Sequence, residues 1–214
     1  MTRPGSVVAL ALALSGAACL GPSPRLIPPE VHMASGAAWP GLPDSYRMIH
    51  RVHLDVRGRS LDFLGYLAVS GSRWRAVAFT EMGGRLFDLI SENGRPEVLL
   101  SPPGMPRAAL LDGVMRDIAA AFVPAWPSGR PAGRGEGGPV LADGTSKVVL
   151  RRGGETISEI TLLSTRSVDG WPSAVPDRVS MRNLHWGYVM EAKLVRLDLR
   201  PVDEAAFRRG KAGK

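Results

Sequence analysis

Alternation between apolar and polar residues, interrupted by glycine turns, is the feature of this sequence that most restricts its fold. A period of two places successive side chains on opposite faces of an extended strand. One face of the first such run reads Tyr46, Met48, His50, Val52, Leu54 and Val56. Shorter runs follow over residues 61–69, 74–80, 86–90 and 98–100, separated by turns that contain glycine. Because one of these turns is Asn93-Gly94, a strong hairpin signal, the runs predict an antiparallel meander.

One helix is expected after the meander. Pro102-Pro103 stops the sheet, and apolar residues then recur at helical spacing: Leu110, Leu111, Val114, Met115, Ile118 and Phe122. Polar residues fall opposite this stripe: Arg107, Asp112, Arg116 and Asp117. Strands resume over residues 146–152, 156–164, 179–184 and 188–200. Eight or nine strands around one helix place the chain in the mainly β (α+β) class.

Several of the predicted strands are apolar on both faces. Leu64 and Tyr66 oppose Phe63 and Leu67 in one strand, and residues 86–90 show the same surplus. Both faces then need a cover, yet the sequence offers one good helix. A sheet that curls around the helix covers one face. Such a curl either leaves an apolar hollow suited to an acyl chain or packs to a filled core, and the sequence leaves both open.

The chain begins with the pattern of an export signal that ends at Cys19, the only cysteine. A short apolar run and small residues precede the thiol, which resembles a bacterial lipobox. The resemblance implies that Cys19 carries a lipid anchor, and Leu20 in place of Asp implies sorting to the cell outer membrane, on its periplasmic face. We expect a signal peptide over 1–18, a lipidated Pro-rich tether over 19–44, a folded domain over 45–202 and a charged tail over 203–214.

Charge and composition exclude several functions. Lys and Arg exceed Asp and Glu by seven, but export makes phosphate-bearing lipids nearer partners than nucleic acid, so no nucleic-acid binding is expected. His50 and His53 fall on opposite faces of one strand and cannot share a metal. No Gly-x-Ser-x-Gly elbow occurs. We therefore expect no enzyme activity, no metal and no cofactor.

The hairpin region resembles that of LolA/LolB-like lipoprotein-handling domains. The likeness is carried by residues 65–69 and 74–89, and the helix after Pro103 and the late strand 175–181 follow in the same order. The chain is also similar to small bacterial lipoproteins of unknown function allied to that group. Over residues 45–200 the resemblance implies an incomplete antiparallel β-barrel with a helical plug and a hollow that accepts lipid.

Together these features predict an outer-membrane lipoprotein that binds or transfers acylated lipid or lipoprotein cargo without catalysis. Its partners would be the membrane, through the Cys19 anchor, and the cargo, and no protein partner is identified. The alternatives are a structural or protein-binding envelope lipoprotein with a filled core, and an accessory subunit of an envelope lipid-synthesis system. Ten positions are candidates for the cavity or plug: Phe63, Leu67, Val77, Phe79, Phe87, Leu89, Leu110, Val114, Ile118 and Phe122.

Overall fold

One antiparallel sheet forms the frame of the molecule. The computed structural model describes residues 30–33, 41–92, 94–123 and 146–208. Ten described strands lie in the order β1-β7-β8-β9-β10-β2-β3-β4-β5-β6. Their bounds are β1 Glu30–Met33, β2 Ser45–Val56, β3 Arg59–Ser70, β4 Arg73–Phe79, β5 Arg85–Glu92, β6 Arg95–Leu100, β7 Ser146–Arg152, β8 Glu155–Arg166, β9 Val175–Asn183 and β10 Tyr188–Asp198.

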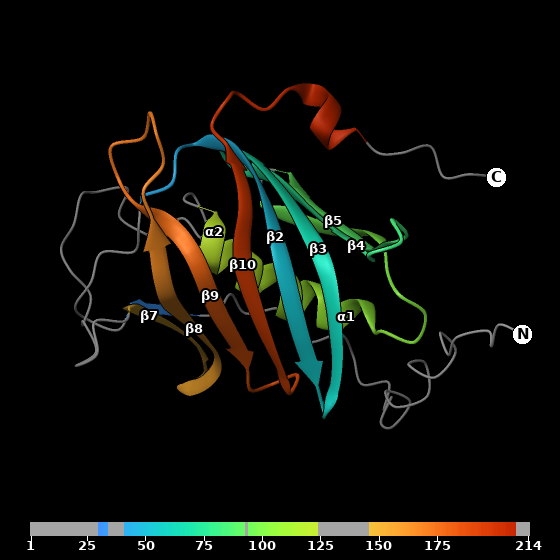
Figure 1. The fold of residues 1–214 in the computed structure, drawn as a ribbon. Coiled ribbons are helices and arrows are strands. Elements are labelled where there is room, and N and C mark those ends of the chain that lie inside the picture. The colour runs from blue at the N-terminus through green and yellow to red at the C-terminus, as the bar shows by residue number, and fades with distance from the viewer. Residues whose placement is uncertain (1–29, 34–40, 93, 124–145, 209–214) are drawn as a thin grey trace, which may run out of the picture.

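Two meanders make up all of this sheet except its edge strand β1. β2–β6 form one and β7–β10 the other, and the first and last long strands join them, with Tyr188 opposite Val56 and Asp198 opposite Arg47. The described strand order ends at β1 on one side and β6 on the other, so the curled sheet stays open (Figure 1). The predicted mainly β class, with an incomplete antiparallel barrel, is therefore confirmed.

Tight turns fix the register of the long hairpins. Arg57 and Gly58 connect β2 to β3, and both have positive φ, 52° and 76°. That geometry is the type I′ turn, whose twist matches that of the flanking strands. In the resulting register Val52 lies opposite Phe63 and Leu54 opposite Leu61. The inward residues of both strands therefore fall on the same face of the sheet.

The predicted helix lies in the concavity of the sheet. It consists of α1 Arg107–Ala109, the π-helical turn η2 Leu110–Val114 and α2 Met115–Phe122. In Figure 1 it runs behind β10, β2 and β3. Leu110, Val114 and Phe122 are buried in one cluster with the inward side chains of the sheet. The sequence thus locates the plug correctly.

The polar side of this helix is buried as well, contrary to the amphipathic prediction. Asp112, Arg116 and Asp117 expose 7%, 8% and 0% of their surfaces. The strands of the second meander cover this side, and α2 contacts β8 and β9. A helix enclosed by a curled sheet needs partners for its polar groups, and the ion pairs and hydrogen bonds described below supply them.

The close approach of this cover depends on Gly113 in the π-helical turn. A Cβ atom at this position would lie 2.9 Å from Cδ1 of Trp186 and 3.3 Å from Cε1 of Tyr188. Any larger residue would have to push the indole away. The hydrogen bonds of a π-helical turn span five residues instead of four. Gly113 therefore also lies where the helix departs from ideal α-helical geometry.

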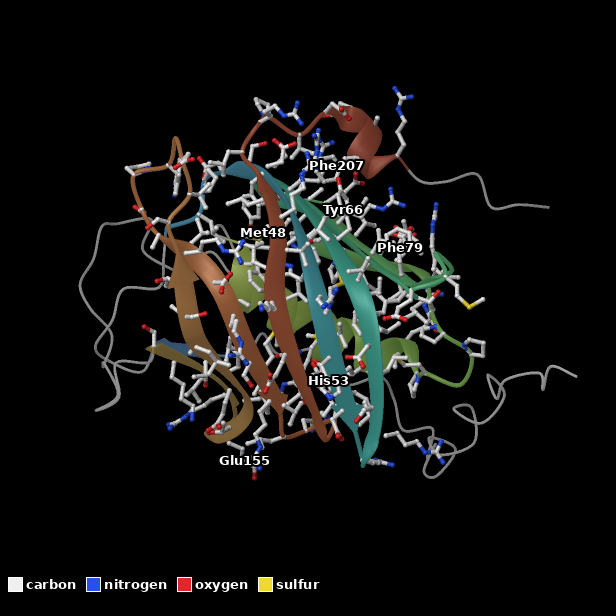
Figure 2. All side chains as sticks on the ribbon, in the orientation of Figure 1. Met48, His53, Tyr66, Phe79, Glu155 and Phe207 are labelled. Carbon is white, nitrogen blue, oxygen red and sulfur yellow. The ribbon has the colours of Figure 1, made fainter. Side chains whose placement is uncertain are left out.

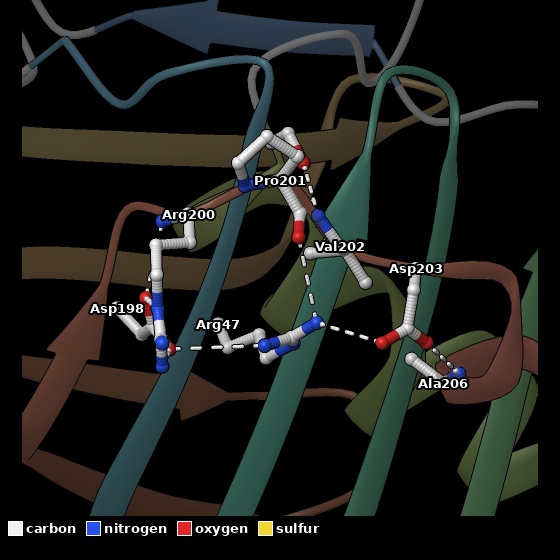
Figure 3. Close-up of polar contacts among 8 residues, drawn as sticks. Arg47, Asp198, Arg200, Pro201, Val202, Asp203 and Ala206 are labelled. Carbon is white, nitrogen blue, oxygen red and sulfur yellow. Dashed lines mark hydrogen bonds and ion pairs between the residues drawn. The ribbon is translucent and has the colours of Figure 1, made fainter.

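The C-terminal segment covers the convex face of the first meander. The short helix η3 Glu204–Phe207 places Phe207 in a small buried cluster with Ala68 and Ile90. Arg47 reaches the carbonyl of Pro201 and the carboxylate of Asp203, both at 3.4 Å (Figure 3). Residues 203–208 therefore belong to the folded domain, although the sequence predicts a charged tail there.

Buried charge holds the same segment to the sheet. Arg75 forms a two-pronged ion pair with Asp88, at 2.8 and 2.6 Å, on the convex face of β4 and β5. Its remaining Nη1 donates to the carbonyls of Ala206 and Arg208. Arg73 pairs with Glu204 and lies over the ring of Phe207. Residues 202–207 thus cover apolar side chains on the convex face of these strands.

A short strand lies where the sequence predicts a linker. Residues 30–33 form β1, which pairs antiparallel with β7, Glu30 lying opposite Arg151 and Met33 opposite Val148. These residues fall inside the segment expected to be a Pro-rich tether. Alternation over four residues is too short to distinguish a strand from a linker, so the pairing appears only in three dimensions.

Candidate functional site

An apolar pocket opens between the helix and the β2–β3 end of the sheet, and we call it the outer pocket. Its volume is about 120 Å³. Inward side chains of β2, β3, β5 and β10 meet the start of the helix here, and two arginines of the β2–β3 turn stand beside them. The bordering residues are Leu54, Val56, Arg57, Arg59, Leu61, Phe63, Leu86, Phe87, Pro102, Met105, Leu110, Val114 and Met190.

A second, smaller cavity lies between the helix and the centre of the sheet, bordered mostly by almost fully buried residues, and we call it the inner chamber. Its volume is about 40 Å³. The residues that border it are His50, Val52, Phe63, Gly65, Tyr66, Leu67, Ala76, Val77, Phe87, Ile118, Phe122, Met181, Met190 and Ala192. Phe63, Phe87 and Met190 border both spaces. These three side chains therefore form the partition between the outer pocket and the inner chamber.

Eight of the ten predicted cavity or plug positions face the concave side. Phe63 and Phe87 border both cavities, Leu110 and Val114 border the outer pocket, and Leu67, Ile118 and Phe122 border the inner chamber. Leu89 is fully buried in the same core without bordering either space. The structure thus brings these helix and strand residues together.

The other two positions lie on the convex side of β4. Val77 borders the inner chamber, yet its register partner is Tyr66, which packs in the convex cluster near Phe207. Phe79, which Figure 2 labels, pairs with the 39% exposed Leu64 and borders neither cavity. Ala76 and Ala78 occupy the inward positions of this strand instead. Large side chains on both faces hid the direction of the alternation.

His50 is the polar exception on the concave face. Its side chain is 5% exposed and lies against Phe122, with ring centroids 4.7 Å apart. Burial lowers the pKa of His50 to about 4, which the negative charge of Asp177 opposes only in part. The imidazole is therefore neutral at physiological pH. Its Nε2 has no hydrogen-bond partner among the described residues.

Buried polar groups also tie the helix to the second meander. Asp117 accepts hydrogen bonds from Tyr188 at 2.5 Å and from Asn183 at 3.1 Å. Burial raises the pKa of Asp117, and these hydrogen bonds lower it in part. Burial also raises the pKa of Tyr188, helped by the charge of Asp117, so the hydroxyl stays protonated and donates. Neither cavity includes these groups, so the network acts as a structural joint.

A second joint lies one turn earlier on the helix. Asp112 pairs with Arg116 on its own helix and with Arg152 at the end of β7. Burial, together with the charge of Arg152, lowers the pKa of Arg116 to about 10. The guanidinium therefore remains charged at neutral pH and offsets the Asp112 carboxylate. These residues fix the helix in the concavity at the side remote from the outer pocket.

The outer face of the sheet carries a larger but polar groove, of about 240 Å³. Two pairs of its side chains contact each other, His53 with Asp62 at 2.8 Å and Arg178 with Glu191 at 3.7 Å, and Arg51 and Lys193 border it as well. These contacts are exposed ion pairs, which contribute little free energy because solvent screens them. The outer pocket is the better ligand site because its lining is almost wholly apolar and comes from several elements.

Several bordering residues were not among the sequence candidates, notably Leu54, Leu61, Met105 and Met190. Leu54 and Leu61 lie on alternating faces that the sequence shows plainly, whereas Met105 comes from the irregular segment before the helix. Cys19 and residues 124–145 lie outside the described residues. Within the described ranges, no three metal-binding side chains gather and no helix has the length and apolarity to cross a membrane.

Comparison with solved structures returns partial likenesses. A LolA superfamily protein from Nitrosomonas europaea aligns at 9% identity and TM-score 0.44, over 77% of this chain and 90% of that one. A DUF1329 family protein from Desulfovibrio piger gives 5% identity with the same TM-score and coverage. A domain described as a candidate outer membrane lipoprotein-sorting protein from Vibrio parahaemolyticus aligns at 10% identity and TM-score 0.38. This alignment covers 77% of this chain and 89% of that one.

The first and third of these proteins are described in the same terms as the LolA/LolB-like domains that the sequence resembles. Their TM-scores lie below 0.5, so they carry no argument about a ligand. No curated protein matches the sequence. Residues 47–195 match the family described as a protein of unknown function, DUF3261, and this match spans both meanders, the helix and both cavities. The chain belongs to the DUF3261 family.

Proposed function

We propose that this protein binds the acyl chain of a lipid in the outer pocket. The apolar lining of that pocket carries the proposal, since it combines Leu54, Leu61, Phe63, Val114 and Met190 from four separate elements. Each methylene moved from water into such a lining contributes about 0.8 kcal/mol. A chain can therefore be held without a charged clamp, although ordering costs reduce the sum.

The size of the outer pocket limits how much of a chain fits. Small-molecule sites commonly measure roughly 300–1,000 Å³, whereas the outer pocket measures about 120 Å³. An apolar cavity of about 150 Å³ is known to accept benzene. The resting pocket therefore suits a short apolar segment, and a longer chain requires the partition formed by Phe63, Phe87 and Met190 to move.

We further propose that the protein is a lipoprotein, anchored through Cys19 on the periplasmic face of the outer membrane. It would receive or pass on acylated lipid or lipoprotein cargo without catalysis. The N-terminal signal pattern supports the anchor, and the apolar pocket supports the cargo. The rival remains a filled-core envelope lipoprotein, because most of the concave face is tightly packed.

Blocking the pocket tests this function directly. Leu61 is half-buried and borders the pocket, so Leu61→Trp should fill it with little damage to the core. Leu64→Trp on the same strand points to the convex face, where Leu64 is 39% exposed, and is the matched control. A fluorescent fatty acid titrated into the full chain carrying Cys19→Ala should bind saturably, and Leu61→Trp alone should abolish binding. Equal binding by all three proteins would reject the proposal.

A further inference from the structure

We infer that the ligand carries a hydrogen-bonding oxygen on the end that enters first, and that His50 receives this oxygen in the inner chamber. The inference rests on the proposed function, since it concerns the same cavity system. It narrows the ligand from any apolar chain to a single-chain amphiphile with a hydroxyl or carboxyl group at its inner end.

The position of His50 supports this inference. The imidazole borders a cavity whose other lining side chains are apolar, apart from Tyr66, which packs on the convex face. Nε2 is buried without a partner among the described residues. A buried polar group left unpaired is unfavourable, and a hydrogen bond from a ligand would relieve that cost. An apolar side chain would fill this place better if the core had only to pack.

A bound water molecule explains His50 less well. The inner chamber, at about 40 Å³, is large enough for water. A well-held buried water needs two to four polar partners, however, and His50 is the one polar side chain that faces the chamber from the described part of the chain. The chamber is therefore better suited to a ligand whose single oxygen ends an apolar chain.

The outer pocket leads toward His50 along β2. Val56 and Leu54 border the outer pocket from one face of the strand, and His50 lies on the same face four residues before Leu54. The rise of about 3.4 Å per residue sets a path of roughly 20 Å from Val56 to His50. Phe63, Phe87 and Met190 interrupt this path between the two spaces. A chain that displaced them would deliver its inner end to the imidazole.

A neutral imidazole can serve either oxygen. One ring nitrogen donates and the other accepts, according to the tautomer. A hydroxyl can pair with Nε2 in both tautomers, and a carboxylate can pair with it when Nε2 carries the proton. The two oxygens imply opposite orientations of the ligand. A fatty acid that enters with its carboxyl group first lies in the reverse direction to one that enters with a terminal hydroxyl group first.

Two probes distinguish these orientations. Dodecanoic acid and its ω-hydroxy derivative are each used to displace a fluorescent fatty acid from the full chain carrying Cys19→Ala. His50→Leu removes the nitrogen and keeps an apolar side chain of similar reach. We expect it to weaken binding of the hydroxy acid by about three- to tenfold, the effect of losing one hydrogen bond. If dodecanoic acid weakens equally, the carboxyl end enters first, and if it does not, the hydroxyl end does.

Further variants separate this role from packing. His50→Gln restores a hydrogen-bonding group and should recover most of the affinity, and His50→Met replaces His50→Leu if the latter fails to fold. Ile118→Leu changes the shape of the same chamber without a polar atom and should affect both probes alike. Unchanged affinity of both probes for His50→Leu would overturn the inference and leave acyl binding intact. Failure of both probes to bind the unmutated pocket would overturn the proposed function with it.

Discussion

The rings of Phe63 and Phe87 meet edge to face, with centroids 5.8 Å apart, at the boundary between the outer pocket and the inner chamber. Phe63 comes from the β2–β3 hairpin and Phe87 from β5, so the contact also holds neighbouring parts of the meander together. Aromatic pairs of this kind stabilise by about 0.5–1.5 kcal/mol beyond their burial. The same two side chains therefore separate the cavities and stabilise the sheet.

Phe63→Leu should join the two cavities and make binding depend more steeply on chain length. Each additional buried methylene contributes about 0.8 kcal/mol, or roughly fourfold in affinity. Displacement titrations with saturated fatty acids of increasing length measure this slope. Phe79→Leu makes the same change at a residue that borders neither cavity, and should keep the slope of the unmutated chain. Identical slopes for both variants would show that Phe63 does not limit chain entry.

His50 should make the fold less stable as the pH falls. The pKa of His50 is about 4 in the folded chain, whereas its ordinary value, which applies to the unfolded chain, is 6.5. Between these values the unfolded chain binds a proton that the folded chain does not, so stability drops as the pH falls through this window. The difference corresponds to about 3 kcal/mol. Urea unfolding from pH 7 to pH 4 should show this loss, and His50→Leu should reduce it; an unchanged slope would contradict the buried neutral imidazole.

Asp117 should act in the opposite direction. Burial raises its pKa above the ordinary 3.8, so the folded chain holds the proton more tightly than the unfolded chain. The resulting stabilisation is complete below 3.8 and is lost as the pH rises through the folded value. The unfolding free energy of the unmutated chain, relative to Asp117→Asn, should therefore increase toward acid pH. Asp169→Asn, at an exposed turn, is the control, and a difference that shrinks toward acid pH would reject this assignment.

The sequence predicts the sheet well because its alternation and turn glycines are local signals. It locates the helix for the same reason, since Leu110, Val114 and Phe122 repeat at helical spacing. It fails where the partner is distant in the chain. Nothing near Asp117 shows that Tyr188 will bury it, and nothing near Ile90 shows that Phe207 will pack against it.

The cavity is the hardest feature to predict from sequence. Whether apolar side chains fill a concavity depends on how they interlock, and Phe63 and Leu89 look alike in the pattern although only Phe63 borders the space. His50 was visible as a histidine on an apolar strand face. Its role depends on its unpaired nitrogen and on the adjacent chamber, which only the three-dimensional structure shows.

Phe207→Ala should destabilise the domain without changing ligand affinity. Phe207 is 4% exposed and lies beneath the guanidinium of Arg73 on the convex face. Deleting a buried aromatic ring typically costs about 3–5 kcal/mol, measured here by urea unfolding. Val195→Ala, at a 53% exposed position on β10, should have little effect. A loss of fatty-acid affinity in Phe207→Ala at unchanged stability would instead couple this face to the pocket.

Cys19→Ala should release the protein from the membrane. The signal pattern and the position of the thiol motivate this prediction. Stable anchoring needs more than one acyl chain, and a lipobox-type modification would supply several. Partitioning between detergent and aqueous phases measures the release. Cys19→Ala that still partitions with detergent would show that the thiol is not the anchor.

Lipid extraction from the purified protein, followed by mass spectrometry, tests acyl binding most directly. The full chain carrying Cys19→Ala should retain a lipid whose acyl chain ends in a hydroxyl or carboxyl group. The amount should approach one lipid molecule per protein molecule. The same chain with Leu61→Trp should retain none, whereas Leu64→Trp should retain the lipid as before. Equal amounts of lipid on all three proteins, or none on any, would contradict an acyl-binding pocket between the helix and the β2–β3 hairpin.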